Sequence, residues 1–218
     1  MNTRTPPEIN KHIARLIHKV AQGQQPVYLD VIPEPGAIVN ECYANVTKKL
    51  EIAGGEVVYG WQLWEWPHVM VEAEFHAVWR APEGTLHELT PKADGEQRIL
   101  FLPDPHRIYT GTPIDNVRLA IRDDLLVHDF ITVSEEITKV RIRSGIETQP
   151  GMIGVPSHEI NPLLNLQGLI CHMLLQNLRA NAPCACGSGR KYKRCHGASV
   201  AAYKQHQSAQ QFASVVID

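Results

Sequence analysis

Residues 183–197 read PCACGSGRKYKRCHG, and no other stretch of the chain comes so close to dictating its own fold. Cys184 and Cys186 are separated by one residue, and Cys195 and His196 follow after eight more. Three thiols and one imidazole are the sulfur and nitrogen ligands that zinc prefers in a tetrahedral site. Because four protein ligands leave no open position for water or substrate, the spacing predicts one structural zinc ion.

The residues between the two ligand pairs predict a tight turn and then a positively charged surface. The GSG sequence at 187–189 allows the positive φ values of a tight turn. The basic side chains that follow would point outward around the metal: Arg190, Lys191, Lys193 and Arg194. Since the segment has almost no aliphatic side chain, we expect it to be disordered without metal. Disulfide bonding is a poorer explanation, because CxC is too short to bridge easily within itself.

The pattern CxCGSGxKYKxCH resembles the SEC-C motif, the zinc-binding tail of the preprotein-translocase ATPase that also occurs on otherwise unrelated bacterial proteins. The resemblance covers about fifteen of the 218 residues. It implies that Cys184, Cys186, Cys195 and His196 are the zinc ligands. It also implies a protein partner bound through this tail, with ribosome or nucleic-acid contact through the basic residues as a further expectation.

Length and composition bound the rest of the chain. With 218 residues, of which 44% are hydrophobic, the protein can bury a sizeable core, and we expect a main domain over 1–180 and a zinc-binding tail over 181–218. A net charge of −2 argues against nucleic-acid binding by the whole surface. No apolar run is long enough to span a bilayer and no signal peptide is recognisable, so a cytoplasmic protein without membrane contact is expected.

Hydrophobic periodicity predicts an α+β fold with a mostly antiparallel sheet. Helices are expected at 8–23, 41–53, from Pro162 with Asn161 as its cap, and at 199–213. Two short helices are expected within 115–143, and a loop at 148–156. Strands are expected at 27–32, 57–63, 69–79, 85–89 and 98–102.

Cys42, His76 and Glu88 are the candidate catalytic residues. Cys42 begins the second expected helix, and a helix N-terminus with an imidazolium nearby activates a thiol as a nucleophile. His76 lies mid-strand on the polar face of VEAEFHAVW (71–79), and Glu88 follows in the returning strand, where a carboxylate orients an imidazole. His76 and Glu88 share a face only if the loop between their strands has an odd number of residues or a bulge.

A helix headed by cysteine, then a strand with histidine and a strand with an acid, is an order that resembles papain-like and transglutaminase-like thiol enzymes. Three segments between residues 40 and 91 look like the transglutaminase-core pattern: AGGEVVYGW (53–61), FHAVW (75–79) and GTLHELTP (84–91). ECYANV (41–46) is also similar to the CxxENV opening of N-terminal glutamine amidohydrolases. The resemblance implies that Cys42 attacks an amide carbonyl, that His76 transfers the proton, and that Glu88 fixes the histidine tautomer. Glu88 departs from the aspartate that is usual in the transglutaminase family.

The expected enzyme is therefore an amidase, deamidase, peptidase or transglutaminase-like cysteine hydrolase. The Cys42 backbone N–H and the Asn40 side chain are candidate donors to its oxyanion. An alternative stays open, because a buried cysteine and a strand histidine are also ordinary core residues. In that case the protein is a non-catalytic, zinc-dependent adaptor for a chaperone, a ribosome or a protein-translocation component.

Overall fold

The computed structural model describes residues 2–149 and 152–204, with the side chains of 147–149 and 152–153 excepted. The chain forms two compact units, Asn2–Ile121 and the described residues from Arg122 onward. The Cys184–His196 segment lies in the second unit and the predicted catalytic residues lie in the first. The division of the chain into a domain over 1–180 and a zinc-binding tail over 181–218 stays a prediction.

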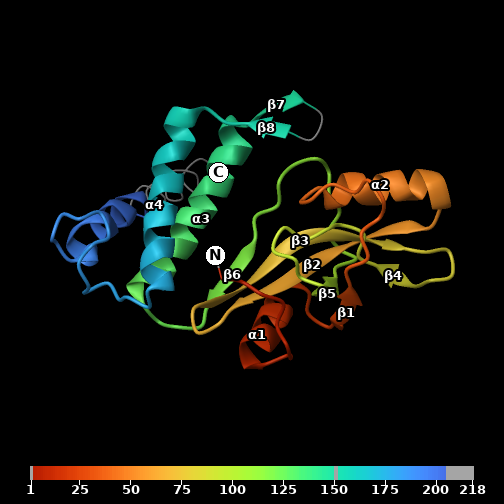
Figure 1. Cartoon of the computed structure of the whole chain (residues 1–218), viewed down its shortest axis with the longest axis horizontal. Coiled ribbons are helices and arrows are strands. Elements are labelled where there is room, and N and C mark those ends of the chain that lie inside the picture. Colours follow the sequence, from red (N-terminus) through yellow and green to blue (C-terminus); the bar gives the residue numbers. More distant parts are fainter. Residues whose placement is uncertain (1, 150–151, 205–218) are drawn as a thin grey trace, which may run out of the picture. The chain divides into compact units, whose positions relative to one another are not determined.

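The first unit is built on an antiparallel sheet (Figure 1). In the described part of the chain its strands are β1 (Val27–Asp30), β2 (Glu56–Trp66), β3 (Met70–Arg80), β4 (Leu86–His87), β5 (Arg98–Pro103) and β6 (Val117–Ala120). Their order is β1-β5-β2-β3-β4, and β6 pairs with β3 as well. The long β2–β3 hairpin forms the centre, and each of the five strand pairings is antiparallel. The prediction of helices combined with an antiparallel sheet is thus confirmed.

Two helices cover one face of the β2–β3 hairpin. Helix α1 (Lys11–Val20) contributes Ile13 and Leu16 to a cluster that includes Trp61 and Phe75. Helix α2 (Cys42–Ala53) contributes Cys42 and Val46 to a second cluster. That cluster includes two further residues of β3, Ala77 and Trp79. Because side chains alternate along a strand, residues 73, 75, 77 and 79 share this core face, as the sequence predicts.

The opposite face of β3 is also largely buried, although its side chains are polar. Glu72 forms an ion pair with Arg118 of β6 at 2.8 Å, and His76 is 5% exposed. Gly60, which pairs with His76 across the hairpin, lets another strand approach closely. A Cβ atom at Gly60 would lie 2.3 Å from the Leu102 carbonyl oxygen and 2.7 Å from the Phe101 ring. Any larger residue at Gly60 would therefore displace β5, which pairs with β2 in the sheet and whose Phe101 ring lies 6.5 Å from the His76 ring.

The helix ends follow local sequence signals. Asn10 caps α1 by accepting hydrogen bonds from the backbone N–H groups of His12 and Ile13. Helix α2 ends at Gly54, where φ is +66°, a value that glycine adopts readily. Gly55 follows with φ +85°, and a Cβ atom there would lie 2.3 Å from the Arg80 carbonyl oxygen. Two glycines are therefore needed to turn the chain from α2 into β2.

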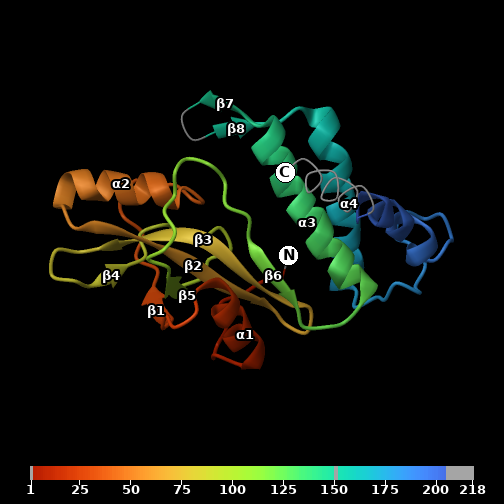
Figure 2. The ribbon, with the colours of Figure 1, turned by 180° about the vertical axis from the view of Figure 1, so that it is seen from behind.

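The second unit pairs two long helices, α3 (Leu125–Ser144) and α4 (Ser157–Leu175) (Figure 2). Their buried faces are mostly apolar, with Phe130 and Val133 on α3 and Leu163 and Ile170 on α4. The strands β7 (Ile146–Gln149) and β8 (Met152–Gly154) connect α3 to α4 in the sequence. After α4 come a short 3₁₀-helix, η1 (Tyr192–Arg194), and a helical stretch over 196–204.

Three sequence predictions in this half of the chain are wrong. Residues 115–143 hold a strand, β6, and one long helix rather than two short helices, because the short run 117–120 pairs with β3. Within the loop predicted at 148–156, residues 148–149 and 152–154 belong to a β-hairpin, and 150–151 lie outside the described residues. Helix α4 starts at Ser157, so Pro162 lies inside it; Ile160, buried at 9% exposure, extends the apolar face toward the N-terminus. The predicted last helix, 199–213, lies outside the described residues beyond 204.

Candidate functional site

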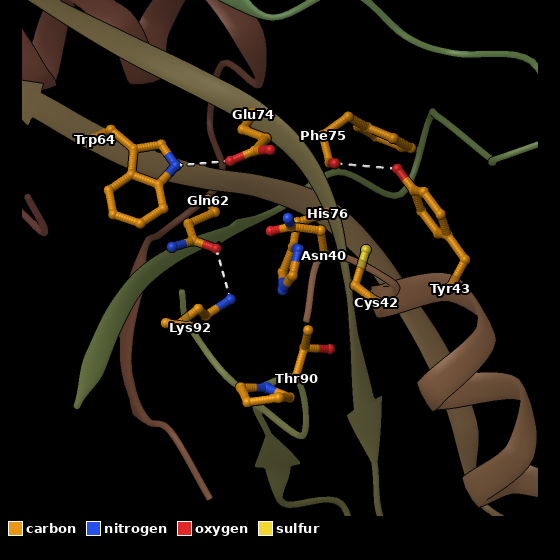
Figure 3. A pocket seen from close by; sticks show the side chains of 11 residues that line it. Asn40, Cys42, Tyr43, Gln62, Trp64, Glu74, Phe75, His76, Thr90 and Lys92 are labelled. Carbon is orange, nitrogen blue, oxygen red and sulfur yellow. Dashed lines mark hydrogen bonds between the residues drawn. The ribbon is translucent and has the colours of Figure 1, made fainter. Parts of the chain in front are cut away.

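A pocket of about 150 Å³ in the first unit is lined by two of the predicted catalytic residues, Cys42 and His76 (Figure 3). Its lining comes from the start of α2, from β2 and β3, and from the segment after β4. The lining residues are Asn40, Cys42, Tyr43, Gln62, Trp64, Glu74, Phe75, His76, Thr90, Pro91 and Lys92.

Cys42 is the first residue of α2, as the sequence predicts, and is 6% exposed. The next residue fixes the helix start against the sheet, since the Tyr43 hydroxyl donates to the Phe75 carbonyl oxygen at 3.0 Å. Asn45 fixes the preceding loop through two hydrogen bonds with the backbone of Ile38, at 2.8 and 2.9 Å. The start of α2, which carries Cys42, is therefore fixed to β3 by Tyr43 and to the preceding loop by Asn45.

His76 connects Cys42 to Glu88. The His76 Nε2 atom lies 2.5 Å from the Glu88 Oε2 atom, and Cys42 is near enough to the His76 ring to act on its pKa. Glu88 is fully buried and its second oxygen accepts the Thr90 backbone N–H at 2.7 Å. Lys92 approaches the same carboxylate at 3.4 Å. The three predicted residues thus lie close together.

The hairpin register explains why Glu88 reaches His76. Arg80 pairs with Leu86 and Trp79 pairs with His87, so the loop consists of residues 81–85, an odd number. An odd loop places the residue after His87 on the face of β3 that carries His76. The condition stated from the sequence is therefore met.

Charge compensation holds His76 in its protonated form. Burial alone would lower the pKa of His76, but the Glu88 carboxylate and Cys42 outweigh it and raise the pKa of His76 to about 10. Burial likewise acts to raise the pKa of Glu88, yet His76, Lys92 and the Thr90 N–H together bring the pKa of Glu88 below its ordinary value. The pair is therefore an imidazolium facing a carboxylate at neutral pH.

This buried pair predicts a pH-dependent contribution to stability. The raised pKa of His76 gives stabilisation that is complete below pH 6.5 and is lost as the pH rises toward 10. The lowered pKa of Glu88 gives stabilisation that is complete above pH 4.5 and is lost as the pH falls. Glu88→Gln should therefore cost about 3 kcal/mol of unfolding free energy between these two values and less on either side.

The measurement is urea unfolding of wild type and Glu88→Gln from pH 3 to pH 10. Glu56→Gln is the matched control, because Glu56 also pairs with a cation, Arg80, but at an exposed position. Exposed pairs contribute at most about 1 kcal/mol, so the control difference should stay small throughout. A Glu88→Gln difference that is the same at every pH contradicts the protonation states assigned here.

Two pocket residues were not singled out from the sequence. Lys92 donates to the Gln62 Oε1 atom at 2.9 Å and also faces Glu88, so it links the two side chains. Gln62 is on the same face of the hairpin as His76, since it pairs with Glu74, two residues before the histidine. Once the pairing of β2 with β3 is known, the alternation of side chains along β2 identifies Gln62 as a residue on the His76 face. Asn40 does line the pocket, in the left-handed region with φ +65°.

In the second unit, Cys184, Cys186, Cys195 and His196 converge as a metal site requires. Their ligand atoms all lie within 4.8 Å of one another. Cys184 Sγ lies 3.2 Å from His196 Nδ1, Cys195 Sγ lies 3.5 Å from the same nitrogen, and Cys186 Sγ lies 3.6 Å from Cys195 Sγ. Bond lengths of about 2.0–2.3 Å to a central zinc ion fit such spacings. The predicted four-ligand cluster is therefore confirmed as a geometry positioned to bind a metal ion.

Ser188 supports the cluster from within the glycine turn. Its hydroxyl lies 3.3 Å from Cys186 Sγ and 3.4 Å from Cys195 Sγ. The hydrogen bonds from Ser188 lower the pKa of Cys186 to about 6. Metals bind thiolates rather than thiols, so Ser188 prepares this sulfur for coordination.

A buried tyrosine anchors the cluster to α3, a contact that the sequence did not reveal. Tyr192 is completely buried, and its hydroxyl donates to the Asp129 Oδ2 atom at 3.0 Å. Lys204 pairs with the other oxygen of Asp129 at 2.9 Å. A Cβ atom at Gly197 would lie 3.0 Å from the tyrosine ring. The basic side chains predicted to point outward are all exposed: Arg190, Lys191, Lys193 and Arg194.

The family model of the SEC-C motif matches residues 181–198, which include the four ligands. SEC-C motifs bind zinc, so the match and the geometry agree on the type of site. Neither the curated proteins nor the solved structures gave a match to the chain. Within the described residues, no helix combines the length and apolar character needed to cross a bilayer. The chain therefore carries a SEC-C motif with a Cys₃His cluster suited to zinc.

Proposed function

We propose that the first unit is a cysteine-dependent hydrolase domain acting on an amide or thioester bond. Cys42 is the nucleophile, His76 the acid and base, and Glu88 the group that orients and charges the histidine. The observation that supports the proposal is that Cys42 and His76 line one pocket while the buried Glu88 carboxylate pairs with the His76 ring. A relationship of this domain to papain-like and transglutaminase-like enzymes is part of the same hypothesis.

The proposed reaction has two steps. A positively charged imidazole favours the thiolate form of the neighbouring sulfur, which forms a bond to the substrate carbonyl carbon. The C–N or C–S bond to the leaving group breaks, and His76 gives its proton to that group. The neutral His76 then takes a proton from water, which attacks the acyl-thioester, releases the carboxylic acid and restores Cys42.

The zinc-binding segment is proposed to dock the chain onto a protein partner, in the cytoplasm. Four exposed basic side chains on so short a segment favour an acidic protein surface, with ribosomal RNA phosphate as the other candidate contact. The exposed basic side chains support docking equally well in the second candidate function, a non-catalytic zinc-dependent adaptor. The two candidates differ in what they require of Cys42.

The experiment that tests the proposal is the reaction of the full-length, zinc-loaded protein with iodoacetamide at pH 7. Cys171 of α4 is a free cysteine that is more exposed than Cys42, so it serves as an internal reference. The proposal expects Cys42 to be alkylated faster despite its burial. If Cys42 reacts no faster than Cys171, the adaptor function stands instead.

A further inference from the structure

Along β3, all of which the structure describes, Glu74 is the one exposed residue. It lies on the same face of the strand as Glu72 and His76. Both neighbours are buried and have a partner of opposite charge, Arg118 for Glu72 and Glu88 for His76. Among the residues that the structure describes, no cation forms an ion pair with Glu74. Its carboxylate is therefore an open negative charge on a face where the neighbouring charges are compensated.

A tryptophan on the neighbouring strand fixes the direction of this carboxylate. The Trp64 indole N–H donates to the Glu74 Oε2 atom at 2.9 Å (Figure 3). Glu74 forms no other hydrogen bond within the described part of the chain, which leaves its Oε1 atom available as an acceptor. A carboxylate beside an aromatic ring suits a cation, because the negative charge and the face of the ring both attract it.

Glu74 and Trp64 line the same pocket as Cys42 and His76. In Figure 3, Trp64 and Glu74 are seen to the left of His76 and Cys42 to its right. Glu74 is two residues before His76, which is about 7 Å along a strand. Burial is the main cause that raises the pKa of Tyr43, the residue after Cys42, and the charge of Glu74 is among the causes that add to it. A ligand that extends from the thiol past His76 would therefore meet the Glu74 carboxylate.

The positive charges of the pocket are less available to a ligand. The Lys92 side chain is 8% exposed, and its ammonium donates to the Gln62 Oε1 atom at 2.9 Å and faces Glu88 at 3.4 Å. The Glu88 carboxylate also compensates the charge of His76. The uncompensated charge that an incoming substrate meets is thus negative.

We propose that Glu74, oriented by Trp64, selects substrates that carry a positive charge close to the bond that Cys42 attacks. The inference rests on the proposed function and adds the class of substrate. The charged group is an ammonium or a guanidinium bound by the Glu74 carboxylate, and the pocket of about 150 Å³ limits it to the size of a short side chain. The same carboxylate repels acidic substrates.

The test compares two reagents that differ in charge, on the full-length, zinc-loaded protein at pH 7. The ammonium reagent is 2-aminoethyl methanethiosulfonate, and the neutral reagent of nearly the same size is 2-hydroxyethyl methanethiosulfonate. A thiolate attacks the sulfenyl sulfur of either reagent, a disulfide bond forms, and methanesulfinate leaves. The quantity measured is the ratio of the two second-order rate constants at Cys42, followed by mass spectrometry. Because a change in the reactivity of the thiol acts on both reagents, the ratio isolates recognition of the charge.

In the wild-type protein we expect the ratio of ammonium to neutral reagent to be higher at Cys42 than at Cys171. Glu74→Gln keeps the length of the side chain and an acceptor for the Trp64 N–H, but removes the charge. It should lower the ratio at Cys42 about three- to tenfold, the size expected of one charge about 7 Å away in a partly solvated site. Glu74→Asp keeps the charge, so its ratio should stay above that of Glu74→Gln.

Glu51→Gln is the matched control for net charge, because Glu51 is exposed on α2 and does not line the pocket. It should leave the ratio at Cys42 unchanged. A ratio that Glu74→Gln leaves unchanged, or that Glu51→Gln lowers equally, overturns the role of Glu74. The proposed function still stands in that case if Cys42 reacts faster with iodoacetamide than Cys171 does. Wild-type Cys42 that reacts no faster than Cys171 with any of the three reagents overturns both.

Discussion

Replacing His76 with alanine is expected to slow the alkylation of Cys42 by iodoacetamide roughly tenfold at pH 7. The thiolate is the reactive form of a cysteine, and in the proposed mechanism the His76 imidazolium is its counter-charge. The substitution also removes a ring from the pocket wall, which would ease entry of the reagent. Because easier access alone would make the reaction faster, a slower reaction would be attributed to the loss of the positive charge.

The measurement is the rate at which the Cys42 peptide gains a carbamidomethyl group, with the Cys171 peptide as reference. His87→Ala is the matched control, since His87 lies in the same hairpin but packs against Trp79 rather than in the pocket. Glu88→Gln should slow the reaction in the same direction, because it removes the carboxylate that keeps His76 protonated. Equal Cys42 rates in wild type, His76→Ala and His87→Ala would refute the proposed activation.

Removing two of the four zinc ligands is expected to abolish zinc binding and the fold of the surrounding segment. The full-length protein should contain one zinc ion per chain, and Cys184→Ser combined with Cys195→Ser should contain none. Structural zinc sites contribute about 10–16 kcal/mol of binding free energy at pH 7, which is folding free energy for a segment without its own core. The double variant should therefore also lose the local fold around the cluster.

Metal analysis and hydrogen exchange measure the two parts of this prediction. The Cys184 and Cys195 backbone N–H groups, which bond to the carbonyl oxygens of Arg190 and Tyr192, should exchange freely in the double variant. Cys171→Ser is the matched control and should keep both the zinc and the protection. Zinc at one ion per chain in the double variant would show that the ligands are wrong, and retained protection without zinc would show that the metal is not structural.

The sequence predicted the parts of both sites that depend on local spacing. Cys184, Cys186, Cys195 and His196 were recognisable because a closed zinc shell needs its ligands at short, fixed intervals. Cys42 was correctly placed at a helix start, since the run after it is helical and a glycine pair ends it. Whether His76 and Glu88 share a face depends on whether the loop between their strands has an odd or an even number of residues. The sequence leaves both possible, and the pairing of β3 with β4 shows that the number is odd.

The missing parts depend on contacts between residues far apart in the chain. Gln62 and Lys92 meet only because β2 pairs with β3 and the segment after β4 returns beneath them, which no local pattern encodes. Tyr192 and Asp129 are 63 residues apart and look like ordinary polar positions in the sequence. The sequence predicts helix where the structure has the short strand β6, because four residues give too little periodicity and the pairing of β6 with β3 determines its conformation.

The central claim is that Glu88 keeps His76 protonated beside Cys42 at neutral pH. The direct measurement is the titration of the His76 ring by NMR in protein labelled with ¹⁵N-histidine, with its signals identified by their loss in His76→Ala. The account predicts imidazolium signals that persist at pH 8 and disappear only near pH 10, and that are lost at neutral pH in Glu88→Gln. A His76 ring that titrates near its ordinary pKa of 6.5 in the wild-type protein would contradict the account.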